Sequence, residues 1–181
     1  MRKYEMVKDK NDMYRIVAVR DFANIRKGQY GGLIQNESNL SHYGNCWVDY
    51  NASVRGAARV SGNAQIFGTA SIYGDAVITG DVMIADNATI ADNAMVYGNA
   101  VITGDSMVFG NAIVNGHAVL TGNAIITGNA IITDNAIITG VVSIREYASV
   151  HGNAKVLGNV LLDGNTAIGG NEVVQNNIKQ E

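Results

Sequence analysis

The sequence predicts an all-β fold, a parallel β-helix solenoid of about seven coils with a small N-terminal β cap. An aliphatic residue occupies every sixth position over 127 residues, and in most units a small residue precedes this anchor by two positions. A period of six is neither helical nor a plain strand alternation, so each unit is a short strand followed by a corner. Three corners close one 18-residue coil. The 22 anchors are Val48, Val54, Val60, Ile66, Ile72, Ile78, Ile84, Ile90, Val96, Ile102, Val108, Val114, Leu120, Ile126, Ile132, Ile138, Ile144, Val150, Val156, Leu162, Ile168 and Val174.

The other positions of the unit also have structural roles. Alanine occupies the small position in 15 of the 22 units, and residues two apart in a strand share a face, so both types line the interior. The position two after the anchor is usually glycine, replaced by Asp86, Asp92 and Asp134 in three units. Both residue types tolerate a positive φ, as a corner requires. Asparagines that recur every 18 residues are expected to form hydrogen-bonded ladders along the axis.

The period divides the chain into three segments. Residues 1–45 lack it and are expected to form a capping segment, 46–175 form the solenoid, and 176–181 are a polar tail. Within the cap we expect strands at 3–7 and 13–19 and a turn at 27–32, "KGQYGG". His42 falls on the anchor position before Val48, where it is expected to close the core.

Composition narrows the functional classes. The formal net charge is -3, but residues 1–45 carry eight basic against five acidic residues. This mild basic excess lacks the dense stripe with interleaved aromatics that nucleic-acid binding favours, so we expect no nucleic-acid partner. Cys46 is the single cysteine, no apolar run reaches membrane-spanning length, and no signal-peptide pattern follows Met1. We therefore expect a cytoplasmic protein without a membrane partner.

The repeat resembles a known family. The segment "TGNAIITGNAIITDNAIITG" (121–140) is similar to hexapeptide-repeat proteins, and the resemblance implies a left-handed coil and a homotrimer. The segments "YRIVAVRDFANIRKGQYGG" (14–32) and "ESNLSHYGNCWVDYNASV" (37–54) resemble the N-terminal region of YdcK-like, transferase-type β-helix proteins of bacteria and phages. Hexapeptide-repeat acyltransferases bind acyl-CoA between protomers and use a histidine as general base.

Candidate chemistry is sparse in this chain. The resemblance implies His117 as the catalytic base, but His117 replaces an asparagine in a corner column, and a tolerated corner substitution is the explanation that this position favours. Acyltransferases of this type also extrude a loop from the coil, whereas here the period is uninterrupted from Val48 to Val174. No metal site and no phosphate-binding loop is expected, because no Cys/His cluster and no Gly-Lys-Ser/Thr motif occurs.

Apolar residues at outward positions predict an oligomer interface. They immediately precede the anchors of the middle coils, and a third face carries a shorter set, Met107 and Ile125. Contiguous exposed apolar stripes usually mark an interface, and two such faces suit a trimer; strand propensity alone is the alternative explanation. The expected interface residues are Met83, Val101, Val119 and Ile137 on one face and Val77, Met95, Ile113 and Ile131 on a second.

Two hypotheses about function follow. The first is a non-catalytic, trimeric β-helix scaffold that binds a protein or small-molecule partner through its flat faces or intersubunit grooves and needs no cofactor. In the family's setting, this would be a phage-borne accessory or inhibitor protein. The alternative is an acyltransferase that uses acetyl-CoA or another acyl-CoA, with His117 as the base.

Overall fold

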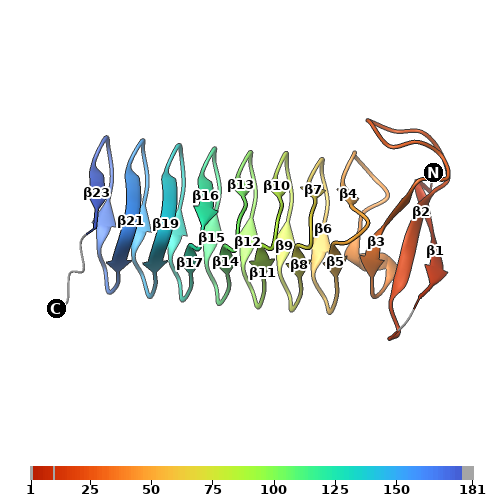
Figure 1. Cartoon of the computed structure of the whole chain (residues 1–181), viewed down its shortest axis with the longest axis horizontal. Coiled ribbons are helices and arrows are strands. Elements are labelled where there is room, and N and C mark those ends of the chain that lie inside the picture. Colours follow the sequence, from red (N-terminus) through yellow and green to blue (C-terminus); the bar gives the residue numbers. More distant parts are fainter. Residues whose placement is uncertain (1, 10, 177–181) are drawn as a thin grey trace.

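The chain folds into a parallel β-solenoid of about eight turns with a β-hairpin packed over its N-terminal end (Figure 1). The computed structural model describes residues 2–9 and 11–176. The predicted fold class is confirmed. Of the predicted tail, 176–181, all but Asn176 lie outside the described residues.

Each complete coil contributes one strand to each of three faces, named here by an exposed residue. The Met107 face contains β3 (Tyr30–Ile34), β5 (Ser53–Val54), β8 (Ser71–Ile72), β11 (Thr89–Ile90), β14 (Met107–Val108) and β17 (Ile125–Ile126). The Met83 face contains β4 (Trp47–Val48), β7 (Gln65–Ile66), β10 (Met83–Ile84), β13 (Val101–Ile102), β16 (Val119–Gly122) and β23 (Val173–Gln175). The Val77 face contains β6 (Arg59–Val60), β9 (Val77–Ile78), β12 (Met95–Val96), β15 (Ile113–Val114), β18 (Ile131–Ile132), β20 (Ser149–Val150) and β22 (Ala167–Ile168).

Two long strands, β19 (Ile137–Ile144) and β21 (Lys155–Leu162), run without a break from the Met83 face onto the Met107 face. They join these two faces into one 16-stranded sheet, while the Val77 face remains a separate 7-stranded sheet. At the corner that these two strands cross, the small position is Val142 in one coil and Val160 in the next. The earlier coils have alanine or serine at the same corner. The larger, β-branched side chain favours extended backbone at that corner.

The register confirms the predicted 18-residue coil. Met95 pairs with Val77 on one side and with Ile113 on the other, both in parallel. Every anchor from Val48 to Val156 is buried, as are the alanines of the small position. The interior is therefore one continuous column of aliphatic and alanine side chains. Burial of each large aliphatic side chain contributes about 1.5–3 kcal/mol of transfer free energy.

The corners have the backbone conformation that the sequence predicts. Asp86, Asp92 and Asp134 have φ between 57° and 59°. Each carboxylate also accepts the backbone N–H of the glycine 18 residues later, at 2.8–3.0 Å. Glu146 behaves in the same way, with φ 61° and a 3.0 Å bond from the N–H of Gly164. An acidic side chain thus caps the next coil wherever one replaces the corner glycine.

The predicted asparagine ladders are present. Asn93 donates to Asn111 at 3.1 Å and Asn111 to Asn129 at 3.2 Å. In the column that contains His117, Asn63 donates to Asp81 and Asn135 donates to Asn153. These side-chain bonds link successive coils along the solenoid axis, outside the backbone ladder.

The cap is correctly predicted in its first two strands. β1 (Tyr4–Lys8) and β2 (Tyr14–Ala18) form an antiparallel hairpin, and β2 also pairs with β3. The predicted turn at 27–32 is wrong in its second half, because β3 begins at Tyr30. A Cβ on Gly31 would lie 2.5 Å from Trp47, and one on Gly32 would lie 2.4 Å from the carbonyl oxygen of Ala52. These two glycines allow close packing against the first coil and do not form a turn.

The solenoid consequently begins earlier than its sequence period. β3 pairs in parallel with β5, so residues of the predicted cap already form the first turn. On the Val77 face, Leu40 takes the core position opposite Val60. The prediction that His42 occupies this anchor position is wrong, because the phase shifts by two residues between Leu40 and Cys46. A short 3-10 helix, η1 (Glu37–Asn39), precedes Leu40. Ile34 pairs with Val54 at the same offset as Leu40 with Val60, so the two extra residues lie after Leu40, in the loop that leads to Cys46.

Candidate functional site

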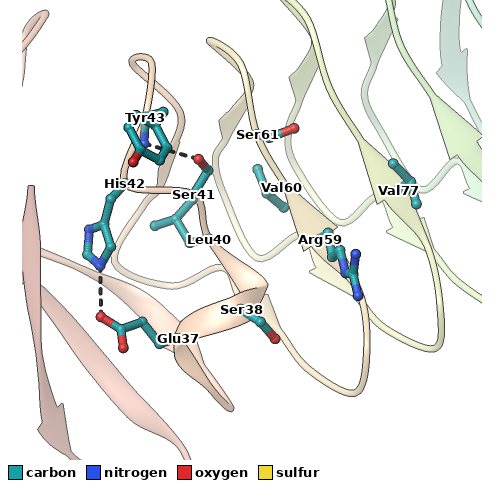
Figure 2. Close-up of a pocket in the computed structure, with 10 residues that line it drawn as sticks. All are labelled: Glu37, Ser38, Leu40, Ser41, His42, Tyr43, Arg59, Val60, Ser61 and Val77. Carbon is teal, nitrogen blue, oxygen red and sulfur yellow. Dashed lines mark hydrogen bonds and ion pairs between the residues drawn. The ribbon is translucent and has the colours of Figure 1, made fainter. Parts of the chain in front are cut away.

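A pocket lies where the cap meets the first coils of the Val77 face. It has a volume of about 360 Å³ and opens between the segment around η1 and strands β6 and β9 (Figure 2). In this part of the chain, η1, the single bridge from Leu40 to Val60 and the loop after it take the place of a regular strand before β6. It is lined by Glu37, Ser38, Leu40, Ser41, His42, Tyr43, Arg59, Val60, Ser61 and Val77.

His42 forms one wall of this junction pocket, and both of its ring nitrogens are engaged. The backbone N–H of Lys3 donates to Nδ1 at 3.3 Å, so the ring carries its hydrogen on Nε2. Nε2 lies 2.9 Å from a carboxylate oxygen of Glu37, and the ring stacks on Tyr4 with centroids 4.2 Å apart. His42 therefore connects strand β1 to the loop and has no free nitrogen for acid–base catalysis.

Glu37 is held on the cap side of the junction pocket. The same oxygen that contacts His42 lies 3.1 Å from the guanidinium of Arg2. The hydrogen bond from His42 and the charge of Arg2 lower the pKa of Glu37 below its ordinary value. Glu37 thus remains an ionised group whose charge is balanced within the cap.

Beneath the hairpin, Lys3 is fully buried. Its ammonium donates to the carbonyl oxygen of Cys46 at 2.8 Å, to the Cys46 sulfur at 3.1 Å and to the carbonyl oxygen of Gly44 at 3.4 Å. It also lies 5.3 Å from the centre of the Phe22 ring. Burial is the main cause that lowers the pKa of Lys3. The three acceptors compensate the burial of the charge and fix the cap to the first corner of the coil.

His117, the predicted candidate base, lies at an exposed corner between β15 and β16. Its backbone N–H donates to the carbonyl oxygen of Asp134 at 2.6 Å. Among the described residues, its ring has no hydrogen-bond partner that would orient it. Within residues 2–9 and 11–176, no second candidate catalytic group is hydrogen-bonded to the His117 ring. The junction pocket lies at the N-terminal end of the Val77 face, at β6 and β9, whereas His117 follows β15, the middle strand of that face.

The predicted interface residues form two straight files on the surface of the chain. On the Val77 face the file is Val77, Met95, Ile113 and Ile131, in register on consecutive coils. On the Met83 face it is Met83, Val101, Val119 and Ile137. Val77, Met83, Met95 and Ile131 are 37–40% exposed, and the other four are half-buried. Each file presents a continuous apolar strip four coils long.

Neither a metal centre nor a membrane-spanning helix is found among the described residues. Within 2–9 and 11–176, no group of three or more His, Cys, Asp or Glu side chains could hold a metal ion. In the same residues, no helix is long and apolar enough to cross a membrane. Comparison with known proteins finds no matching protein-family model and no matching curated protein.

Sequence reasoning missed the junction pocket and the buried Lys3. Lys3 contacts residues about 40 positions away, and the pocket forms where residues 37–43 meet strands β6 and β9. No periodic signal encodes these contacts. The one available signal is the failure of the six-residue period before Cys46, which marks where the chain departs from the coil.

Proposed function

We propose that the protein is a non-catalytic β-solenoid scaffold that assembles into homotrimers and binds a partner through its flat faces or intersubunit grooves. The observation that supports the proposal is the pair of apolar files, which leave eight aliphatic or Met side chains partly exposed on two faces. Strips of this length on a single chain usually mark an interface. In a cyclic trimer every chain presents two different surfaces, one to each neighbour, which matches two files on two faces.

Location and partner class belong to the same proposal. The single cysteine is free and buried, which favours a reducing compartment such as the cytoplasm. A phage-borne accessory or inhibitor role accords with the resemblance to phage β-helix proteins. The partner would be a protein or a small molecule, and neither role needs a cofactor.

The assembly is tested by placing two charges in one file. We expect Ile113→Lys combined with Ile131→Lys to convert the trimer into a 19.2 kDa monomer in light scattering, because a desolvated lysine pair opposes burial of the strip. The matched control is Ser71→Lys with Thr89→Lys, two stacked outward positions on the Met107 face. The control should remain trimeric. A monomeric wild-type protein, or a trimer that survives both changes in the file, would contradict the proposal.

The non-catalytic part is tested against the acyltransferase alternative. We expect no heat in a calorimetric titration with acetyl-CoA, because no described residue is hydrogen-bonded to the His117 ring and the coil continues without a loop at that corner. The titration is repeated with His117→Ala and, as a control change of another exposed histidine, with His151→Ala. Binding of acetyl-CoA that disappears only in His117→Ala would contradict the scaffold proposal and support the acyltransferase alternative.

A further inference from the structure

The junction pocket has a distinctive distribution of charge. Glu37 is paired with Arg2 and His42 on the cap side, whereas Arg59 is on the opposite side, on strand β6 (Figure 2). Arg59 is exposed and makes no ion pair within residues 2–9 and 11–176. Its guanidinium is therefore the charge in the pocket that is left for a ligand.

Of the hydroxyls of Ser41 and Ser61, which both line the junction pocket, only one is free to donate to a ligand. The hydroxyl of Ser41 accepts the backbone N–H of Tyr43 at 3.0 Å, which leaves its own hydrogen free to donate. Ser61 donates to Thr79 at 3.0 Å and is already engaged. Arg59 and Ser41 can therefore both donate to a ligand group that accepts hydrogen bonds.

The remainder of the lining is apolar. Leu40, Val60 and Val77 contribute aliphatic surface, and the ring of Tyr43 stands at the rim with its side chain exposed. A volume of about 360 Å³ is at the small end of ligand pockets. The pocket therefore suits a small molecule with one acceptor group and a compact apolar part.

We propose that the junction pocket binds a small monocarboxylate whose carboxylate is attached to an apolar group. The carboxylate pairs with the planar guanidinium of Arg59, which offers two parallel N–H donors, and accepts the hydroxyl of Ser41. The apolar group packs against Leu40 and Val77. A phosphate dianion is disfavoured, because one arginine faces it and the ionised Glu37 lines the same pocket.

Benzoate is a suitable probe, and benzamide is its uncharged counterpart of nearly the same shape. We expect benzoate to produce saturable shifts in the amide signals of residues 37–43 and 59–61 in ¹H–¹⁵N spectra. Arg59→Gln should weaken this binding at least about tenfold, and benzamide should bind at least about tenfold more weakly than benzoate. Arg55→Gln is the matched control, because Arg55 lies outside the pocket, over the ring of Tyr73. It should leave the affinity within about twofold.

Three outcomes would overturn the proposal. They are equal benzoate affinity in Arg59→Gln and wild type, equal affinity for benzamide and benzoate, or no saturable shift below about 20 mM. Signals outside the pocket must be unchanged in Arg59→Gln, which shows that the variant is folded. Val77 belongs both to the pocket and to the apolar file. Repeating the titration on the Ile113→Lys, Ile131→Lys protein therefore separates ligand binding from assembly.

Discussion

Replacing Gly80 by alanine is expected to lower the free energy of unfolding by about 3 kcal/mol or more, a large effect for a single corner position. Gly80 has φ 96°, a conformation that costs an L-residue about 1–2 kcal/mol. A Cβ there would also lie 2.5 Å from the carbonyl oxygen and 2.9 Å from the nitrogen of Gly98 in the next coil. Relieving that contact requires two backbone segments to separate, which strains the hydrogen bonds between coils.

Gly170 provides the matched control for this effect. Its φ of 62° is also left-handed, but a Cβ there would meet nothing within 4 Å. Gly170→Ala should therefore cost only the conformational part, about 1–2 kcal/mol. Urea unfolding followed by circular dichroism measures both variants. Equal losses in the two proteins would show that backbone conformation alone, and not the spacing of the coils, sets the cost.

Replacing Lys3 by methionine is expected to release the cap from the first coil. The change keeps most of the apolar stem but removes the donor to the carbonyl oxygens of Cys46 and Gly44. A buried acceptor left without a donor costs about 1–3 kcal/mol, which weakens the attachment of the hairpin to the first coil. We expect faster hydrogen exchange throughout β1 and β2 and unchanged exchange in the middle coils, such as β12.

Lys8→Met is the control for the Lys3 variant, since Lys8 is the last residue of β1, the strand that Lys3 directly precedes, and is exposed. It should leave exchange in the hairpin close to that of the wild type. Unchanged protection of β1 and β2 in Lys3→Met would contradict the role assigned to the ammonium. Faster exchange along the whole solenoid would show that the cap and the coils unfold as one unit.

Most of the solenoid could be predicted from the sequence because its contacts repeat. Each anchor from Val48 onward meets the residue 18 positions away, so the six-residue period encodes both the strand and its neighbour. The same regularity predicted the left-handed corner at Asp86 and the exposed file that contains Ile131. In these parts, a local pattern is enough to specify the packing.

The cap and the junction pocket could not be predicted in this way. The position of Leu40 opposite Val60 and the engagement of His42 by Glu37 and Lys3 depend on contacts that occur once. A local pattern at Gly31 suggested a turn, but tertiary packing against Trp47 is what requires a glycine there. Propensity therefore gave the wrong element for the start of β3.

The sequence by itself determined that this chain coils every 18 residues around an aliphatic interior, because burial is dictated by a period that each unit carries. Only the tertiary structure decided where the coil begins, how Lys3 is compensated, and that Arg59 faces a pocket without an ion-pair partner among the described residues. These features arise where a non-repeating segment meets a repeating one, and their energies come from single long-range contacts that leave no periodic trace in the chain.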